Sequence, residues 1–165
     1  MHMSIDSYNK MNTIMAACFD ANAVVDNLAY NLDYHYFNEI AEVVHLHVAH
    51  VMPEWADLFS EELLMLSARP VRKNINGYEQ EISNLTEIFN VLLETFLSLK
   101  QQVKELIESA DMDGDDEIRI FGEEFLKNHL EKFIKQAEEW INASSVLSPA
   151  EMNIHIKQYT HFIAC

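Results

Sequence analysis

The chain has 165 residues, 49% of them hydrophobic, and a formal net charge of −16. This length and composition predict one globular domain with a sizeable buried core. Phosphate backbones repel so acidic a surface, which excludes duplex DNA as a direct partner.

Turn-forming residues are scarce, since the chain contains only three Gly and three Pro. Long elements with few turns follow, and this favours helices over strands. Cys18 and Cys165 have neither metal-ligand nor disulfide-framework spacing, which fits a reducing compartment. No apolar run approaches the roughly 18 residues of a membrane span. We therefore expect a cytoplasmic protein without membrane contact.

The acidic residues are unevenly distributed along the chain. Between Met11 and Ala68 there is no Lys or Arg, whereas nine carboxylates occur there. One interpretation is solubility through self-repulsion, and the other is the collection of cations. The charge pattern alone leaves both interpretations open.

Apolar residues recur at helical spacing over residues 7–31, which predicts a first amphipathic helix. A second apolar series over residues 37–66 predicts a second helix, which ends before Pro70. Pro53 falls inside that series and removes a backbone donor. It predicts a kink or, as the alternative, two helices that meet at Met52-Pro53.

A polar loop over residues 71–77 separates the first helical pair from the second. Apolar residues then alternate at spacings of three and four over residues 78–110, which predicts a long third helix. An acidic turn over residues 111–116 precedes a fourth helix that extends to about residue 143. Short connections within each pair imply two antiparallel hairpins, so the segment between the pairs must return across the bundle.

A short fifth helix is predicted after Ser148, because Ser caps helices, Pro149 suits the first helical position and Glu151 completes a capping box. We expect it to reach about residue 162. This divides the chain into a bundle over residues 7–143 and a C-terminal extension over residues 144–165.

Two stretches resemble the Dps branch of the ferritin-like family. DLFSEELLMLSARP, over residues 57–70, is similar to the end of the family's second helix, where Asp57 and Glu61 match two acidic positions. The stretch IESADMDGDDEIRIFGEEFLKNHLEKF, over residues 107–133, is similar to the family's passage into its last helix. The resemblance implies an all-α, ferritin-like antiparallel four-helix bundle. It also implies capture or oxidation of Fe²⁺, with iron stored in an oligomeric shell.

The chain also departs from the family pattern. The family's ferroxidase centre uses a His of the first helix and a His and an Asp of the second. Those positions fall near Tyr30, Glu42 and Leu46, which are different residue types. Glu62 stands where the family has Arg, and the basic tail with which some members hold DNA is missing. Ferroxidase activity is therefore implied only on condition that other residues supply the ligands.

A wheel at about 100° per residue places six possible iron ligands on one stripe of the second helix, opposite its apolar side. They are His35, Glu39, Glu42, His50, Asp57 and Glu61. Their oxygen and nitrogen donors suit iron. In a Dps-like homo-oligomer this face meets a neighbouring subunit, so the ion would lie between two chains. The alternative is a solvated polar face without a metal.

Three further patterns have competing interpretations. Glu42 and His45 fit the Glu-x-x-His pair of di-iron bundles, yet the fourth helix lacks a second pair. His45, His47 and His50 do not converge on one ion from a straight helix, and His129 is expected in the core beside a hydrogen-bonding neighbour. The turn over residues 111–116 imitates an EF-hand loop but lacks its glycine and final glutamate, so we interpret it mainly as a helix break.

These observations favour a Dps-type iron-binding protein. The competing hypothesis is a non-catalytic ferritin-like dimer or scaffold, and a hemerythrin-type oxygen or metal binder ranks third. Mass in solution, together with metal analysis, separates storage in a shell from the simpler dimer.

The acidic composition generates a first prediction. The protein should not retard duplex DNA at physiological salt, because it has no run of Lys or Arg that could release phosphate counterions. A gel-retardation assay with chelator present checks this, since the chelator removes metal-bridged contacts. Retardation that weakens as salt is added would contradict the prediction.

Overall fold

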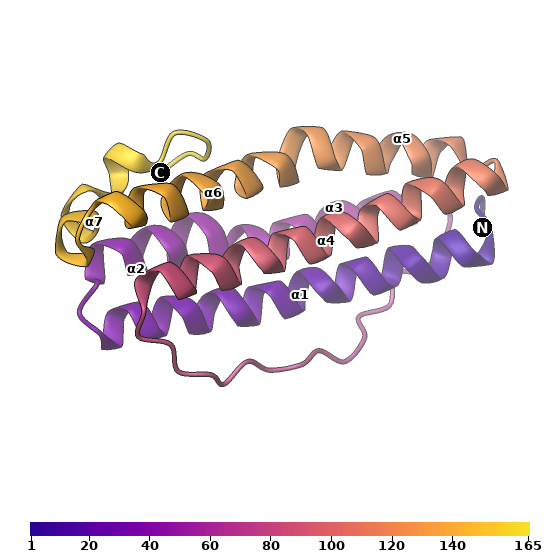
Figure 1. The fold of residues 1–165 in the computed structure, drawn as a ribbon. Helices are drawn as coiled ribbons and strands as arrows, with labels where there is room; N and C mark the ends of the chain where they lie inside the picture. Colours follow the sequence, from indigo (N-terminus) through magenta and orange to yellow (C-terminus); the bar gives the residue numbers. More distant parts are fainter.

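Four long helical segments lie along one axis in the computed structural model, which describes residues 1–165 (Figure 1). The elements in chain order are α1 (Ile5–Tyr34), α2 (Asn38–Val44), the π-helical turn η1 (His45–Ala49), α3 (Val51–Met65), α4 (Leu85–Asp113), α5 (Asp116–Phe125), the π-helical turn η2 (Leu126–Leu130), α6 (Glu131–Val146), α7 (Pro149–His155) and the 3-10 turn η3 (Ile156–Tyr159). No strand occurs, so the predicted all-α class is confirmed. None of the helices combines the length and the apolar character that a bilayer crossing requires.

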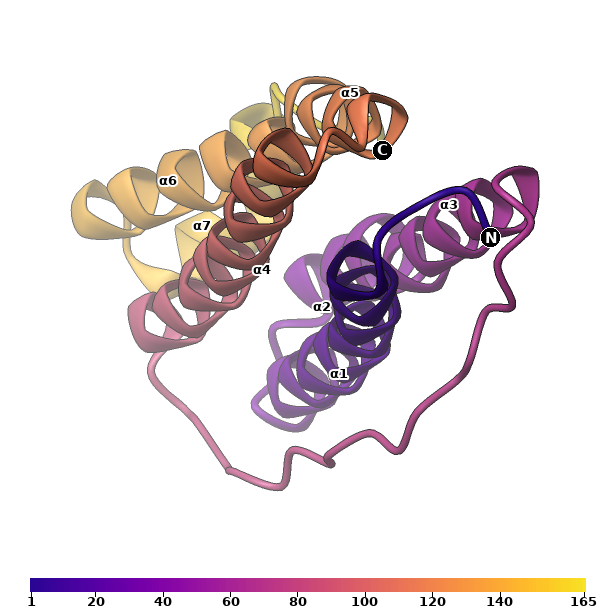
Figure 2. The same ribbon diagram turned by 90° about the vertical axis from the view of Figure 1, so that its right-hand side faces the viewer.

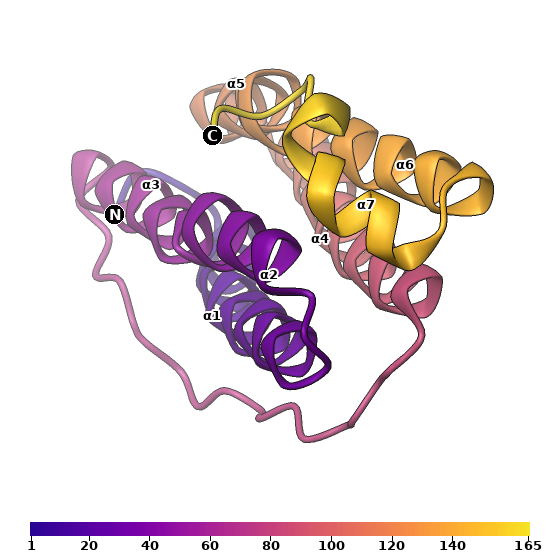
Figure 3. The ribbon, with the colours of Figure 1, turned by 90° about the vertical axis from the view of Figure 1, so that its left-hand side faces the viewer.

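The bundle consists of two antiparallel hairpins, as predicted. α1 runs against α2 and α3, and α4 runs against α5 and α6 (Figure 1). The end views show one pair facing the other, with the connecting segment passing along the outer side of α1 (Figures 2 and 3). Contacts between α1 and α4 join the two hairpins into one bundle.

The third helix starts later than its apolar pattern predicted, at Leu85 and not at residue 78. Asn84 is the N-cap of α4, because its side chain accepts a hydrogen bond from the Glu87 backbone N–H at 2.9 Å. Such a side-chain cap satisfies a backbone donor that the first helical turn leaves free. The crossover therefore spans residues 66–84 without regular structure, and it is longer than the predicted loop over residues 71–77.

Polar side chains of α1 hold this crossover against the bundle. The carboxamide oxygen of Asn12 accepts a hydrogen bond from the Val71 backbone N–H at 2.8 Å. Asp20 accepts from the Asn76 N–H at 2.6 Å, and Asn31 accepts from the Ile82 N–H at 3.2 Å. These side chains replace the backbone partners that an irregular segment lacks, which keeps its N–H groups satisfied.

The turn between α4 and α5 is a helix break, as its sequence predicted. Gly114 ends α4 in the left-handed region at φ 73°, a conformation that costs glycine little. The Asp115 carboxylate accepts hydrogen bonds from the Ser4 N–H at 3.1 Å and the Ser7 hydroxyl at 2.6 Å. Asp115 thus anchors the N-terminal end of α1, and its oxygens are engaged by the protein itself.

The irregularity that Pro53 predicted lies one turn earlier, in the π turn η1. There the His50 N–H donates to the His45 carbonyl at 3.2 Å, five residues back. Pro53 itself lies inside α3, so the alternative of two helices meeting at Met52-Pro53 is wrong. The Ala49 carbonyl, which has no Pro53 N–H to accept from, accepts a hydrogen bond from the Asn22 side chain of α1 at 2.9 Å. This contact compensates for the missing backbone donor.

Aromatic side chains fill the space between the second and fourth helical segments. The Trp55 ring makes edge-on contacts with Phe125 and Phe133, at centroid distances of 5.4 and 4.9 Å. Phe59 meets Phe125 in the same manner at 5.0 Å. Edge-to-face pairs of this kind add to the free energy gained by burial alone. The predicted apolar stripes of the first and third helices are likewise buried.

The C-terminal extension packs against the start of the second helix. The capping box of Ser148 and Glu151 is present, as predicted, but α7 ends at His155 and η3 ends at Tyr159, short of the predicted residue 162. The Asn153 side-chain oxygen accepts hydrogen bonds from the Glu39 and Ile40 N–H groups, both at 3.1 Å. It thereby caps α2, whose own N-cap residue makes no side-chain hydrogen bond.

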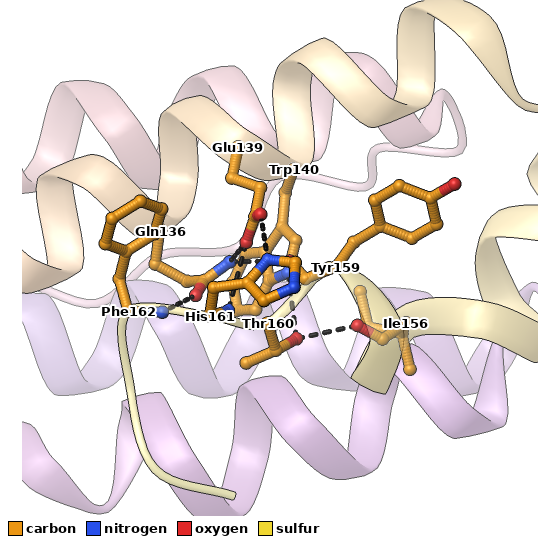
Figure 4. A network of polar contacts seen from close by, with 8 residues as sticks. All are labelled: Gln136, Glu139, Trp140, Ile156, Tyr159, Thr160, His161 and Phe162. Atoms are coloured by element: carbon orange, nitrogen blue, oxygen red, sulfur yellow. Dashed lines mark hydrogen bonds and ion pairs between the residues drawn. The ribbon is translucent and has the colours of Figure 1, made fainter.

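Beyond η3 the chain turns back over α6 and is held by three of its side chains (Figure 4). The buried Gln136 side chain donates to the Tyr159 carbonyl and accepts from the Phe162 N–H, both at 2.8 Å. Glu139 accepts from the His161 backbone and contacts the His161 ring. Trp140 donates to Thr160 through its indole N–H at 3.2 Å. We call residues 160–165 the C-terminal tail.

The packing generates a second prediction. Trp55 and Trp140 are 2% and 1% exposed, so replacing either with Ala should lower the free energy of unfolding by about 3–5 kcal/mol through the cavity left behind. Urea unfolding measures this, with Leu97→Ala, which alters a 45% exposed side chain, as the control expected to stay within about 0.5 kcal/mol. Losses below about 1 kcal/mol for both tryptophans would mean that neither ring supports the core.

Candidate functional site

The six predicted metal ligands are spread over the length of the second helical segment. Five of them are exposed: Glu39 and Glu42 on α2, His50 at the end of η1, and Asp57 and Glu61 on α3. His35 lies before α2 and is half-buried, with its Nε2 3.5 Å from the Glu81 carboxylate of the crossover. Within one chain no three His, Cys, Asp or Glu side chains come together as a metal site.

The π turn changes the helical phase between the first and the second part of this set. A π turn takes in one residue more than an α turn, so every later residue is rotated by about 100° relative to an uninterrupted helix. Glu39 and Glu42 precede η1, whereas Asp57 and Glu61 follow it. With that rotation, His50, Asp57 and Glu61 fall within about 40° of Glu42 and opposite the buried side of the segment. The π turn therefore leaves them on one outward face, and His50, Asp57 and Glu61 form the part of it along α3.

The π turn also brings together two histidines that a straight helix would separate. The rings of His45 and His50 lie 4.5 Å apart between centroids, edge to face. His45 Nδ1 lies 3.2 Å from the Asp26 carboxylate of α1, and both facing atoms are shielded from solvent without a well-aligned hydrogen bond. Of the three histidines His45, His47 and His50, only His47 lies apart from the others, as expected, and its side chain is on the side towards α6.

Asp26 and His45 are the polar pair that sequence reasoning missed. Pro53 signalled an irregular helix, but nothing in the sequence located the extra residue at η1. With the π turn in place, His45 faces α1 and does not pair with Glu42, which is exposed. The Glu-x-x-His interpretation of this pair therefore lacks a common inward face.

His129 lies at the edge of the core, and not inside it as predicted. Its ring is half-buried and lies 5.8 Å from that of Phe125, and no protein group accepts or donates a hydrogen bond to it. Burial lowers the pKa of His129, and the nearby Lys132 charge lowers it further. The imidazole is therefore neutral at pH 7.

Exposed apolar side chains accompany the outward stripe of α3. Leu64 and Met65 are 63% and 79% exposed, and helical spacing places both on the same face as Asp57 and Glu61. The two carboxylates, four residues apart, are neighbours on the helix surface, and no Lys or Arg pairs with either. This outward stripe, formed by His50, Asp57, Glu61, Leu64 and Met65, combines imidazole, carboxylate and apolar groups on one surface.

Glu62 is half-buried on the side of α3 that faces α5. Partial burial raises the pKa of its carboxyl, and repulsion from Glu117 and Glu124 raises it further. The folded environment therefore disfavours the charged form of the Glu62 side chain. This repulsion lies between α3 and α5.

The comparison with protein families identifies the class. Residues 8–145 match the family model described as "Ferritin: Ferritin-like domain", which covers most of the chain. The chain therefore belongs to the ferritin-like family, in agreement with the bundle topology and the predicted fold. The comparison with individual curated proteins returned no match.

Glu62 provides a third prediction. The pKa of Glu62 is raised in the folded state from its ordinary value of 4.5. At any pH above 4.5 the ionised carboxyl therefore lowers the free energy of unfolding. Glu62→Gln should therefore raise the melting temperature at pH 7, and the gain should shrink as the pH falls towards 4.5, where the parent carboxyl takes up a proton. Thermal unfolding across this range tests it. Glu105→Gln, at an exposed position on α4, is the control, and an equal gain in both variants would contradict the prediction.

Proposed function

We propose that this ferritin-like protein is of the Dps type and captures Fe²⁺ on the outward stripe of α3, between two copies of the chain. The captured iron is oxidised to Fe³⁺ as an oxidant such as dioxygen or peroxide accepts the electron, and it is stored within a hollow oligomer. Both cysteines are free thiols, which fits a reducing compartment. We therefore place this activity in the cytoplasm.

The donor set supports iron as the cargo. His50, Asp57 and Glu61 offer one imidazole and two carboxylates, and such nitrogen and oxygen donors suit Fe²⁺. One chain does not close a metal site around them. In a dimer with a twofold axis, the outward stripe of one copy would face the same stripe of the other copy, which doubles the number of donors.

The observation that carries the proposal is the apolar pair beside the carboxylates. Leu64 and Met65 are among the most exposed large apolar side chains of the protein, and burying them gives association a favourable term. A face that only solvates the helix has no use for them. Their position next to Asp57 and Glu61 ties the interface and the iron site to one surface.

The charge of this surface explains why the metal and the assembly depend on each other. Two copies that meet through the outward stripe bring four carboxylates together, and no Lys or Arg of this stripe neutralises them. Such carboxylates repel one another unless a cation lies between them. Fe²⁺ therefore stabilises the assembled state by mass action, and its removal weakens assembly.

The fourth prediction tests this coupling. Asp57→Asn combined with Glu61→Gln should abolish both the Fe²⁺-induced rise in melting temperature and iron oxidation, while helicity is retained. Metal-free assembly should become stronger, because the repulsion is gone. Thermal shifts under anaerobic Fe²⁺, absorbance of Fe³⁺ after admission of air, and mass in solution are the measurements.

The matched control is Glu105→Gln combined with Glu108→Gln, which removes the same charge from exposed positions on α4. It should behave like the parent protein. If the parent shows no thermal shift with Fe²⁺ and the Asp57/Glu61 variant is indistinguishable from it, the outward stripe binds no iron. The protein is then a ferritin-like scaffold, whose mass in solution does not respond to chelator.

A further inference from the structure

A concave surface lies between α3 and α6, where Glu54 borders it from the side of the outward stripe. It is a pocket of about 430 Å³ with a floor formed by Trp55 and Phe133. Val51 and Leu58 line its α3 side, and Phe162 and Ile163 of the C-terminal tail border it. The volume and the mostly apolar lining are typical of sites for small molecules.

Both π turns supply a histidine to this pocket. His47 comes from η1 and His129 from η2, although the two turns are far apart in the chain. π turns inside α-helices occur frequently at functional sites, because the extra residue redirects side chains that a regular helix would place elsewhere. Two such turns that border one pocket indicate a surface shaped for binding rather than a packing gap.

The polar groups on the α6 side of the pocket can all donate hydrogen bonds. The neutral His129 ring, the Asn128 amide and the Lys132 ammonium group come from the fourth helical segment. No carboxylate lies within 4.0 Å of Lys132, although the chain has 27 acidic and only 11 basic residues. Glu54 lines the opposite side of the pocket, and both it and Lys132 are exposed, so water screens both charges.

The C-terminal tail contributes walls of the pocket that lie outside the residues matched by the family model. Phe162 and Ile163 lie outside residues 8–145, which match the ferritin-like family. The tail is fixed next to the pocket because Gln136 holds the Phe162 N–H and Glu139 holds the His161 N–H (Figure 4). A wall held by backbone hydrogen bonds is pre-organised, which lowers the entropic cost of binding.

We propose that this pocket binds a small amphipathic anion. Its apolar body rests on Trp55 and Phe133 under the tail, and its negatively charged group lies beside Lys132, within reach of the donors of Asn128 and His129. The proposal is independent of iron, so it is tested on the full chain with chelator present. Its failure and that of the iron site are therefore separable.

The probe pair is anilinonaphthalene sulfonate and phenylnaphthylamine, which share an aromatic body but differ in the anionic group. The sulfonate should bind saturably at one site per chain, with quenching of Trp55 retained in a Trp140→Phe variant. It should bind at least about fivefold more tightly than the neutral probe, the effect of one partly exposed ion pair. Decanoate should displace it.

Two lysine variants distinguish the pocket from nonspecific dye binding. Lys132→Gln should weaken sulfonate binding about fivefold and leave binding of the neutral probe unchanged. Lys127→Gln, exposed on η2 and outside the pocket lining, should change neither. Phe162→Ala should weaken both probes, because it removes apolar wall from the pocket. Equal affinity for the two probes, or equal effects of the two lysine variants, would overturn the proposal.

Discussion

One extra residue, taken up in the π turn η1, sets the orientation of everything that follows it on the second helical segment. The His50 N–H reaches back five residues to the His45 carbonyl, and α3 continues from there with a rotated face. Asn22 of α1 stabilises this arrangement, because it donates to the Ala49 carbonyl that Pro53 leaves without a backbone partner. The outward stripe, the His45–Asp26 contact and the direction of His47 all depend on this turn.

The carboxylates of α3 fall into two groups that have different neighbours. Asp57 and Glu61 are exposed beside apolar side chains, where a partner surface and a cation would satisfy both kinds of group. Glu62, by contrast, is held near Glu117 and Glu124 of the same chain, where no cation pairs with it. Similar carboxylates therefore have different consequences, because the helix presents them to different neighbours.

The C-terminal extension completes the domain at two points. Asn153 caps α2, so the start of the segment that carries the outward stripe is stabilised by the end of the chain. The tail then closes one side of the pocket between the π turns through its hydrogen bonds with Gln136 and Glu139. Membership of the ferritin-like family explains the bundle, whereas α7, η3 and the tail lie beyond the matched residues.

The sequence by itself determined the helical class, the number of long helices and the core. The apolar residues of the first and third helices recur at spacings of three and four, and such a stripe is buried in any bundle. Local signals were equally informative where the physics is local: the capping box at Ser148 and the break at Gly114 depend on neighbours within a few residues.

Only the tertiary structure decided where the helices become irregular and which polar groups meet. The late start of α4 depends on the Asn84 cap and on the Asn31 contact that holds the crossover. The Ala49 carbonyl of η1 accepts its hydrogen bond from Asn22 of α1, 27 residues earlier in the chain. Apolar periodicity assumes a regular helix, so it does not reveal an extra residue that tertiary contacts hold in place. The rotation of every candidate ligand after that residue is therefore also hidden from the sequence.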